Sequence, residues 1–210
     1  MVYTPGALRG SEFQPVSSDD PQHALFDPPR LLALLNGLGI EARTALHDPV
    51  LTVAEAKVAT AHVAGCHCKN FFLEERGGAA WLVVLPAERF LDLRVLAEAL
   101  GSRRLSFASA GRLQETLGLS PGSVSPFGVV NDGAGRVRVV LDRELLGRPA
   151  LEFHPLANTQ TTLITPEDLL RFLQETGHPP LLSTFEAWGP WGSGLGGLVY
   201  ALHSAFERRV

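Results

Sequence analysis

Hydrophobic and polar residues follow a helical spacing in the first clearly patterned segment of the chain, after Asp27. Pro28 and Pro29 lead into Arg-Leu-Leu-Ala-Leu-Leu-Asn, and the segment ends at Gly37. An aspartate can cap a helix, proline suits the first helical turn, and glycine is common where a helix ends. The pattern therefore predicts a first helix directly after Asp27.

Alternating apolar and polar residues mark several strands farther along the chain. A half-buried strand is expected where the apolar positions are Ile40, Ala42, Thr44 and Leu46. Two apolar runs, 69–75 and 79–85, flank Arg-Gly-Gly, which is typical of a β-hairpin. Short strand-like runs follow at 105–108, 136–142, 150–154 and 161–164, and the last two are expected to be the final strands.

Helical spacing returns between these strands. Helices are expected over 52–62, where Thr52 is the cap, over 91–100 and over 111–117, and a last one is capped by Thr165 and ends at Gly177. Residues 120–127 are rich in proline and glycine and are expected to form a loop. Because several neighbouring strands are linked as hairpins, we predict an α+β fold with a mixed, mostly antiparallel sheet and flanking helices, not a doubly wound parallel sheet.

The two ends of the chain differ from this patterned region. Residues 1–27 are rich in Pro, Ser, Gly and Asp and show no sustained period, so we expect a flexible arm. Residues 28–183 are expected to form the domain. Residues 184–210 are rich in Gly and Trp, and we expect them to end in a short amphipathic helix with one apolar face formed by Leu195, Leu198, Val199, Leu202 and Phe206.

Composition and charge narrow the function. A chain of 210 residues with 45% hydrophobic content can bury one sizeable core. We expect a soluble cytoplasmic protein, because no apolar run is long enough to span a bilayer and no secretory leader is visible. The net charge of −4 lacks the basic footprint of proteins that bind nucleic acid mainly through phosphates, so any RNA contact is expected to be local. Cys66 and Cys68 are expected to be reduced thiols.

Several common chemistries lack support. A glycine pattern at 192–197 fits a dinucleotide motif, but no strand precedes it and too little chain follows. The cluster of His62, Cys66, His67 and Cys68 has no second ligand pair at zinc spacing, so we expect no metal and no cofactor. Signatures of serine hydrolases, zincins and P-loop enzymes are missing. Solvent-exposed side chains are expected at three histidines and two arginines, namely His47, His67, His178, Arg103 and Arg104.

Three segments together form a recognisable set. They are Gly-Cys-His-Cys-Lys-Asn-Phe-Phe-Leu at 65–73, Gly-Ser-Val-Ser-Pro-Phe-Gly at 122–128, and Phe-His-Pro-Leu-Ala-Asn-Thr-Gln-Thr-Thr at 153–162. In order and spacing they resemble the YbaK-like editing family, which comprises the insertion domain of bacterial prolyl-tRNA synthetases and free-standing prolyl-tRNA editing proteins. The resemblance covers about residues 28–183. Two departures are Phe-Phe-Leu in place of Leu-Phe-Leu and the Cys-x-Cys before Lys69, to which no function is assigned.

The resemblance implies a role for each matched residue. Catalytic positions are implied for Lys69, Gly128 and His154. Substrate-binding positions are implied for Thr52, Asn70, Gly122, Ser123, Ser125, Pro126, Phe127 and Asn158. Taken singly, Lys69 could be a strand-end lysine, Asn70 a turn residue and His154 a core histidine, but three matches in order favour the functional interpretation.

The resemblance implies a trans-editing deacylase that hydrolyses the ester of mischarged tRNA(Pro), foremost Ala-tRNA(Pro). In this mechanism Lys69 anchors the tRNA end, backbone N–H groups of the 122–128 loop stabilise the oxyanion, and His154 shapes the pocket or positions the water. The expected partners are the 3′ aminoacyl end of tRNA and, transiently, a prolyl-tRNA synthetase, with no membrane or DNA, and the protein is expected to be a monomer or homodimer. Alternatives are the same chemistry on Cys-, Ser- or Thr-charged tRNA, a non-catalytic tRNA- or synthetase-binding module, and a structural dimer built on the C-terminal helix.

Overall fold

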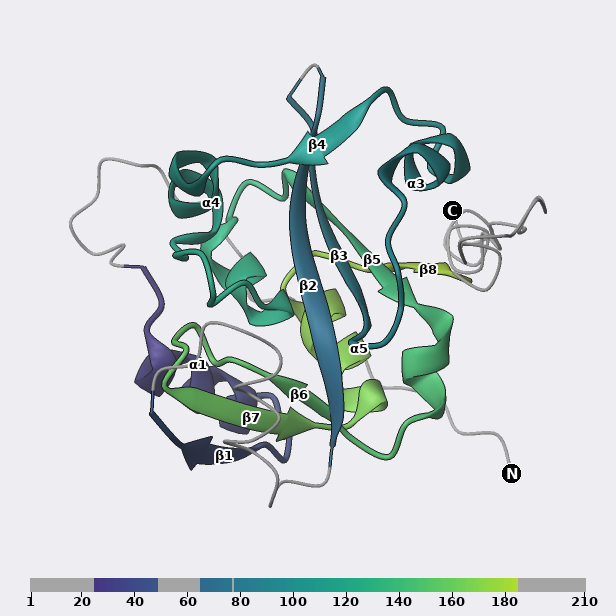
Figure 1. The fold of residues 1–210 in the computed structure, drawn as a ribbon. Coiled ribbons are helices and arrows are strands. Elements are labelled where there is room, and N and C mark those ends of the chain that lie inside the picture. The colour runs from purple at the N-terminus through teal and green to yellow at the C-terminus, as the bar shows by residue number, and fades with distance from the viewer. Residues whose placement is uncertain (1–24, 49–64, 77, 185–210) are drawn as a thin grey trace, which may run out of the picture.

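A mixed β-sheet forms the centre of the computed structural model, which describes residues 25–48, 65–76 and 78–184. Within these residues eight strands pair in the order β1-β7-β6-β2-β3-β5-β8, and β4 pairs with β2 (Figure 1). The strands are β1 (Arg43–Leu46), β2 (Cys66–Glu75), β3 (Ala80–Pro86), β4 (Leu105–Phe107), β5 (Val137–Asp142), β6 (Leu151–Phe153), β7 (Gln160–Ile164) and β8 (Leu181–Ser183).

Strand pairing confirms the predicted fold class. Four pairings are antiparallel, namely β1–β7, β2–β3, β2–β4 and β6–β7, and three are parallel, namely β2–β6, β3–β5 and β5–β8. The predicted hairpin is the β2–β3 pair, in which Lys69 lies opposite Leu85. The β2–β6 pairing is short and includes only Cys66 with Leu151 and His67 with Glu152.

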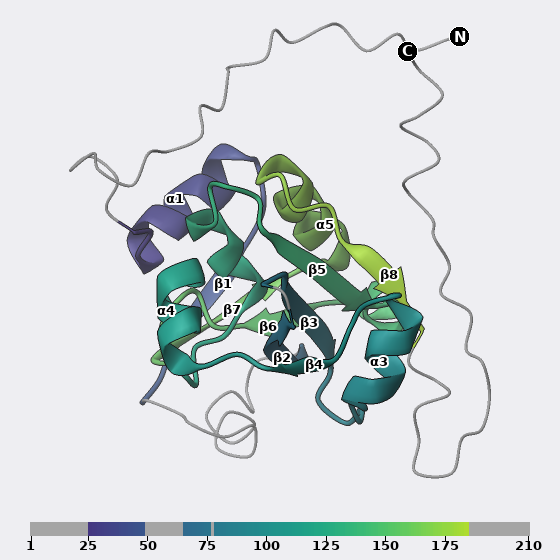
Figure 2. The same ribbon diagram turned by 90° about the horizontal axis from the view of Figure 1, so that it is seen from above.

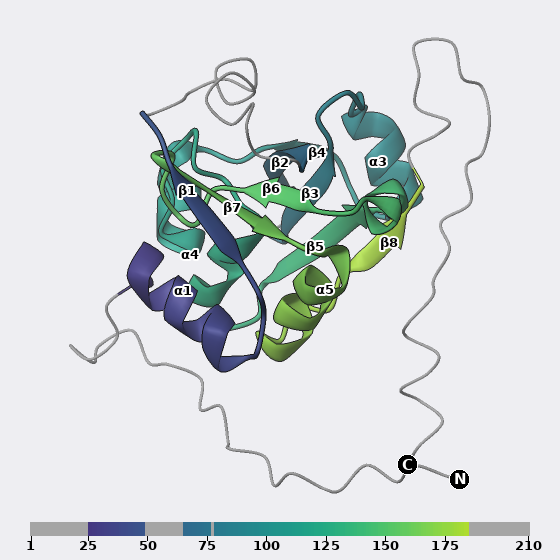
Figure 3. The same cartoon turned by 90° about the horizontal axis from the view of Figure 1, so that it is seen from below.

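Helices cover both faces of the central strands. They are α1 (Pro28–Gly37), α3 (Leu93–Ala99), α4 (Ala110–Leu117) and α5 (Pro166–Glu175), with 3₁₀ turns η1 (Pro126–Asn131) and η2 (Arg143–Gly147). The side chains of Asp27, Asp92, Ser109 and Thr165 cap the four α-helices. Figures 2 and 3 show α1 and α5 on one side of the sheet, with α3 near the other edge beside β4 and β8.

Two hydrophobic cores share the strand β3, which is buried along its whole length. Leu82 and Val84 face the larger core with residues of α1, α4, η1 and α5, whereas Trp81, Val83 and Leu85 face a smaller core with α3. Because each fully buried aliphatic or aromatic side chain contributes about 1.5–3 kcal/mol, the two-sided burial of β3 stabilises the sheet strongly.

Several sequence expectations are corrected here. The strands at 150–154 and 161–164 are not the last, because β8 adds to β5 at the far edge of the sheet. The predicted loop ends at Ser125, the N-cap of η1, which begins at Pro126. The strand predicted from Ile40 begins only at Arg43, while Ile40 is buried in the larger core. The predicted helix over 52–62 and the tail helix lie outside the described residues.

The last residues of the predicted arm contact the domain. Asp27 caps α1, and the backbone N–H of Phe26 donates to Asn131 Oδ1 at 2.8 Å. In the described part of the chain, no helix has the length and apolar character needed to cross a bilayer.

Candidate functional site

The strand β2 presents its candidate residues on two different faces. Cys66, Cys68 and Phe72 pack against the larger core, so the alternate residues His67 and Lys69 lie on the opposite face. Asn70 lies on the same face as Cys68 and Phe72, and its Oδ1 is buried without a hydrogen-bond partner in the described structure. A buried, unsatisfied amide oxygen costs free energy, so Asn70 Oδ1 is available to a donor from a ligand or water.

The end of β6 places His154 on the same face of the sheet as Lys69. Glu152 pairs with His67 in the parallel β2–β6 register, and paired residues share a face. Leu151 and Phe153 enter the larger core, so the alternation directs Glu152, and His154 directly after the strand, to the other face. The structure therefore brings Lys69 and His154 to one surface, which also carries His67 and Glu152.

The imidazole of His154 is fixed in one tautomer. Its Nδ1 lies 2.8 Å from the carbonyl oxygen of Gln160, and a carbonyl can only accept, so Nδ1 carries the hydrogen and Nε2 has a free lone pair. Burial lowers the pKa of His154, and the neighbouring ring of His47, 5.9 Å away between centroids, lowers it further. His154 is therefore a neutral hydrogen-bond acceptor at neutral pH.

The turn that follows His154 is backbone-strained. Leu156 has φ = 68°, the left-handed conformation that non-glycine residues rarely adopt, and its N–H donates to the His154 carbonyl at 2.9 Å. Strained backbone of this kind is concentrated at functional sites. Asn158 lies in the same turn, which connects β6 to β7 (Figure 1).

The 122–128 loop is packed as a rigid unit. Gly122 is exposed with φ = 90°, whereas Ser123, Ser125, Pro126 and Phe127 are buried. The Phe127 ring lies edge-on to Phe153 and Phe172, at centroid distances of 5.9 and 5.3 Å, so Phe127 is a core residue. Its contribution to a pocket, implied by the resemblance, would come from its backbone.

Gly128 is a position where only glycine fits. A Cβ built there would lie 2.7 Å from Leu119 Cδ1, and Leu119 is itself buried. The N–H of Gly128 already donates to the Ser125 carbonyl at 3.0 Å, and the N–H of Phe127 donates to Ser125 Oγ at 3.3 Å. In this conformation these two donors are used within the loop, so an oxyanion would have to be met by the preceding part of the loop.

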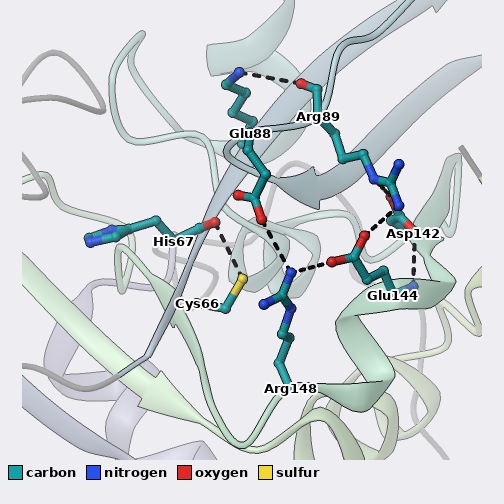
Figure 4. Close-up of polar contacts among 8 residues, drawn as sticks. Cys66, His67, Glu88, Arg89, Asp142, Glu144 and Arg148 are labelled. Carbon is teal, nitrogen blue, oxygen red and sulfur yellow. Dashed lines mark hydrogen bonds and ion pairs between the residues drawn. The ribbon is translucent and has the colours of Figure 1, made fainter. Parts of the chain in front are cut away.

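The ammonium group of Lys69 is held beside a network of charged residues. Lys69 Nζ donates to the carbonyl oxygen of Arg89 at 3.3 Å. Figure 4 shows the side chain of Arg89 reaching toward Asp142 and Glu144, and Glu144 in turn contacts Arg148. The network fixes the backbone at Arg89 and thereby the acceptor that positions Lys69.

Sequence reasoning missed the ion pair between His67 and Glu152. His67 Nδ1 lies 2.9 Å from Glu152 Oε2, and the Glu152 side chain is 2% exposed. The expectation that His67 is solvated is therefore wrong, because the strand register carries its ring onto a buried carboxylate. The alternation along β6 signals that Glu152 leaves the core, but the partner across the strand pair has no local sequence signal.

Two other histidines expected to be solvated are also engaged. His47 Nε2 lies 2.9 Å from Thr161 Oγ1, and its ring packs near His154. His178 is 4% exposed and its Nε2 lies 3.3 Å from Asp132 Oδ2. Arg103 and Arg104 are exposed, as predicted. Tertiary packing overrode the local sequence context at the histidines.

Thr52, a candidate for substrate binding, and His62, a member of the metal-capable cluster, lie outside the residues that the structure describes. Over residues 25–48, 65–76 and 78–184, no three His, Cys, Asp or Glu side chains come close enough to hold a metal ion.

Comparison with known proteins identifies similar sequences and folds. The family model for the aminoacyl-tRNA editing domain matches residues 47–172. The chain is 38% identical over 149 residues to the prolyl-tRNA editing protein ProX of Acetoanaerobium sticklandii, covering 70% of this chain and 91% of that protein. It is 38% identical over 154 residues to the prolyl-tRNA synthetase associated domain-containing protein 1 of Danio rerio, covering 72% and 84% of the two chains.

Solved structures share the fold. A candidate trans-editing enzyme for prolyl-tRNA synthetase superposes with a TM-score of 0.60 and 22% identity, covering 77% of this chain and 98% of that one. The hypothetical protein APE2540 gives a TM-score of 0.59 at 21% identity, covering 73% and 97%. At these identities the match concerns the fold alone.

Proposed function

Because the chain belongs to the aminoacyl-tRNA editing domain family, we propose that it is a trans-editing aminoacyl-tRNA deacylase that hydrolyses Ala-tRNA(Pro). The observation that supports this proposal most is the shared sheet face on which Lys69 and His154 lie. These two residues offer a cation and a neutral imidazole acceptor on one side of the sheet, whereas Asn70, with its buried and unpaired Oδ1, lies on the opposite, core-side face of β2. An ester is activated enough that such groups need only place a water and stabilise the oxyanion.

We propose one step for each residue. The Nε2 lone pair of His154 accepts a hydrogen bond from the attacking water or from the ribose hydroxyl beside the ester, because Nδ1 is fixed as the donor to Gln160. Lys69 binds the terminal phosphate or ribose, and moving from the Arg89 carbonyl to a phosphate exchanges a neutral acceptor for an anionic one. In our proposal a backbone N–H of the 122–125 segment meets the acyl oxygen, other than that of Ser123, which donates to the Ser120 carbonyl oxygen at 3.1 Å. The chain then supplies no covalent nucleophile.

The specificity follows from a limit on hydrophobic pockets. A site for proline cannot keep out the smaller alanine, because one or two missing methylene groups change binding by only about 1–3 kcal/mol. A second, smaller pocket that admits alanine and excludes proline removes the error. In our proposal the rigid 122–128 loop and the strained turn at Leu156 form the walls of this smaller pocket.

The partners follow from the substrate. The protein binds the 3′ aminoacyl end of a mischarged tRNA, and a prolyl-tRNA synthetase that produces this tRNA meets it transiently. Whether the protein acts as a monomer or homodimer can be measured by sedimentation of the full chain.

A deacylation panel tests the proposal. Rates are measured on tRNA(Pro) charged with alanine, cysteine, serine, threonine and proline, with wild type, Lys69→Ala and His154→Ala. We expect rapid hydrolysis of Ala-tRNA(Pro), none of Pro-tRNA(Pro), and a loss of about 100-fold in each variant, as is typical of misplaced reacting groups. Arg103→Ala, which removes an exposed cation on a distant turn, should match wild type.

Each other result has a defined meaning. Faster hydrolysis of tRNA(Pro) charged with cysteine, serine or threonine would support the deacylase reaction but show that alanine is not the preferred amino acid. An inactive wild type that still binds tRNA would replace the deacylase by a binding module.

A further inference from the structure

The pair Cys66 and Cys68 is not used in the mechanism above. Both thiols are free, and both side chains are partly exposed on the core-side face of β2. Residues two apart on a strand point to the same side, so the two sulfur atoms are neighbours. Cys68 Sγ lies 3.4 Å from the Cys66 carbonyl oxygen. Cys66 Sγ lies 3.6 Å from the His67 carbonyl oxygen (Figure 4).

The two thiols have different chemical character. A hydrogen bond from Cys68 lowers the pKa of Cys66, and Arg148 also lowers it, against the opposing effects of burial, Glu88 and Glu144. The same hydrogen bond raises the pKa of Cys68, as do burial and the nearby Glu152. The thiolate is the nucleophilic form of cysteine, so Cys66 is the attacking sulfur and Cys68 the one that follows.

We propose that Cys66 and Cys68 form a peroxide-reactive dithiol that converts to a disulfide and thereby distorts the strand that carries Lys69 and Asn70. The Cys66 thiolate attacks one oxygen of hydrogen peroxide, which breaks the O–O bond, forms the sulfenic acid Cys66–SOH and releases hydroxide, which takes up a proton to become water. The Cys68 thiol then attacks the Cys66 sulfur, and the S–O bond breaks as a second water leaves. Both sulfur atoms are oxidised and the peroxide is reduced to two waters.

Strand geometry explains why this bond would affect the site. Two residues apart on a strand, Cα atoms are separated by about 6.6 Å, since each residue rises about 3.3 Å. Disulfides bridge Cα atoms at about 4.4–6.8 Å and most often near 5.5–6 Å, so closing the bond draws the strand together at its middle residue. That residue is His67.

His67 connects the distortion to the candidate site. Its carbonyl oxygen accepts from the N–H of Ala87 at 2.9 Å, and its ring pairs with Glu152. It belongs to one of only two residue pairs that join β2 to β6. A bend at His67 therefore changes the position of β2 relative to His154, and Lys69 moves with the strand.

Mass spectrometry tests the chemistry independently of the proposed deacylase function. Reduced wild-type protein is treated with a small excess of hydrogen peroxide, the remaining thiols are alkylated, and the peptides are mapped. We expect an intramolecular Cys66–Cys68 disulfide in wild type, and a trapped sulfenic acid on Cys66 in Cys68→Ser. Cys66→Ser should stay unmodified at the same dose. No reaction in wild type, or attack first at Cys68, would overturn the proposal.

The effect on the site is measured on the same samples. This part rests on the proposed function: oxidised wild type should lose at least tenfold in Ala-tRNA(Pro) deacylation and regain it with dithiothreitol, whereas Cys66→Ser with Cys68→Ser should be insensitive to peroxide. A disulfide that forms without changing an active enzyme would refute the coupling. A disulfide in a protein with no deacylase activity in any state would refute the proposed function and leave the dithiol chemistry standing.

Discussion

In the proposed mechanism, the imidazole of His154 can act only while its Nε2 remains a hydrogen-bond acceptor. Burial holds the pKa of His154 below the ordinary histidine value of about 6.5, so the ring is neutral at pH 7. As the pH falls through this lowered pKa, Nε2 gains a proton and the acceptor is lost. The unfolded chain binds that proton at higher pH than the folded one, so the free energy of unfolding also falls between about pH 6.5 and the folded value.

The first prediction concerns the acid limb of the pH–activity profile, which is the fall in activity that protonation of Nε2 should cause. The deacylation kcat/KM of wild type should be flat near pH 7 and decline below about pH 6.5. His154→Gln should be slower by about 100-fold and should lack the limb, because no imidazole titrates at that position. His47→Gln, which alters the neighbouring ring, should retain the limb. An identical acid limb in His154→Gln would assign the titration to another group.

Residues at the candidate site differ in how far the sequence could predict them. Lys69 and His154 carry local motifs, and strand alternation was enough to expect Lys69 at a strand. The ion pair of His67 with Glu152 depends on the register of two strands far apart in the chain. The left-handed backbone of Leu156 has no sequence signal, because leucine is not a residue that favours that conformation.

At the scale of elements, a buried ion pair connects η1, the start of β5 and the end of α5. Asp132 caps η1, its Oδ2 accepts from the N–H of Val137 at 2.6 Å, and His178 follows α5. Burial alone would raise the pKa of Asp132, but the hydrogen bonds from His178 and from the Val137 N–H outweigh it and lower the pKa. The ionised carboxylate is thus a stabilising part of the fold.

The second prediction separates this pair from a surface pair on the same carboxylate. His178→Ala should lower the free energy of unfolding by about 3 kcal/mol, since it leaves a buried charge without its partner. Arg136→Ala removes a half-exposed guanidinium 3.6 Å from Asp132 Oδ1 and should cost about 0.5 kcal/mol. Urea unfolding at pH 7 measures both. Equal losses of unfolding free energy in the two variants would contradict a larger contribution from His178 than from Arg136.

The pH dependence of the same pair has a definite sign. Because the folded pKa of Asp132 is lowered, its contribution is complete above the unfolded value of about 3.9 and is lost as the pH falls through the folded one. The stability difference between wild type and His178→Ala should therefore narrow at acid pH.

The third prediction concerns the contribution of β8 to the free energy of unfolding. Its backbone pairs with Val140, Leu141 and Asp142 of β5, and its Leu181 and Leu182 pack against the smaller and the larger core. A chain that ends at Pro180 should lose about 2–4 kcal/mol of unfolding free energy relative to the full chain, given the value of two leucines. A chain that ends at Thr184 is the matched control and should stay within about 0.5 kcal/mol. Similar urea midpoints for the two truncations would show that β8 contributes little.

Element lengths explain which parts of the fold could be predicted. The helix after Thr165 and the β2–β3 hairpin are long and have clear caps or turn residues, and both were predicted close to their observed bounds. Leu-Leu-Ser in β8 is too short to show alternation, so only its pairing with β5 defines it as a strand. His178 was misassigned because the glycine before it suggested a solvated turn, whereas its partner lies 46 residues away.

At the scale of the whole molecule, the net charge of −4 limits how tRNA can bind. A protein that neutralises many phosphates shows a steep loss of affinity with salt, with a slope near −0.7 per contacted phosphate of a single strand. An acidic protein that grips only the 3′ end has few such contacts.

The fourth prediction is a shallow salt dependence. The logarithm of the Ala-tRNA(Pro) binding constant plotted against the logarithm of the salt concentration should have a slope of about −1.4 to −2.1, which corresponds to two or three phosphates. Lys69→Ala should reduce the slope by about 0.7, whereas Arg103→Ala should not change it. A slope steeper than about −5 would indicate that a broad basic surface, including residues outside the described part, contacts the RNA.

The joint between β2 and β6 has a consequence for how such proteins diversify. The half of the sheet that carries His154 meets the half that carries Lys69 through two residue pairs, while the larger core packs against both halves. Cys66 packs on that core at the joint, and His67 pairs there with the buried Glu152. A substitution at either residue that changes the span between Lys69 and His154 would therefore also disturb packing, so under the proposed function a shift in the accepted amino acid and a loss of stability would come together.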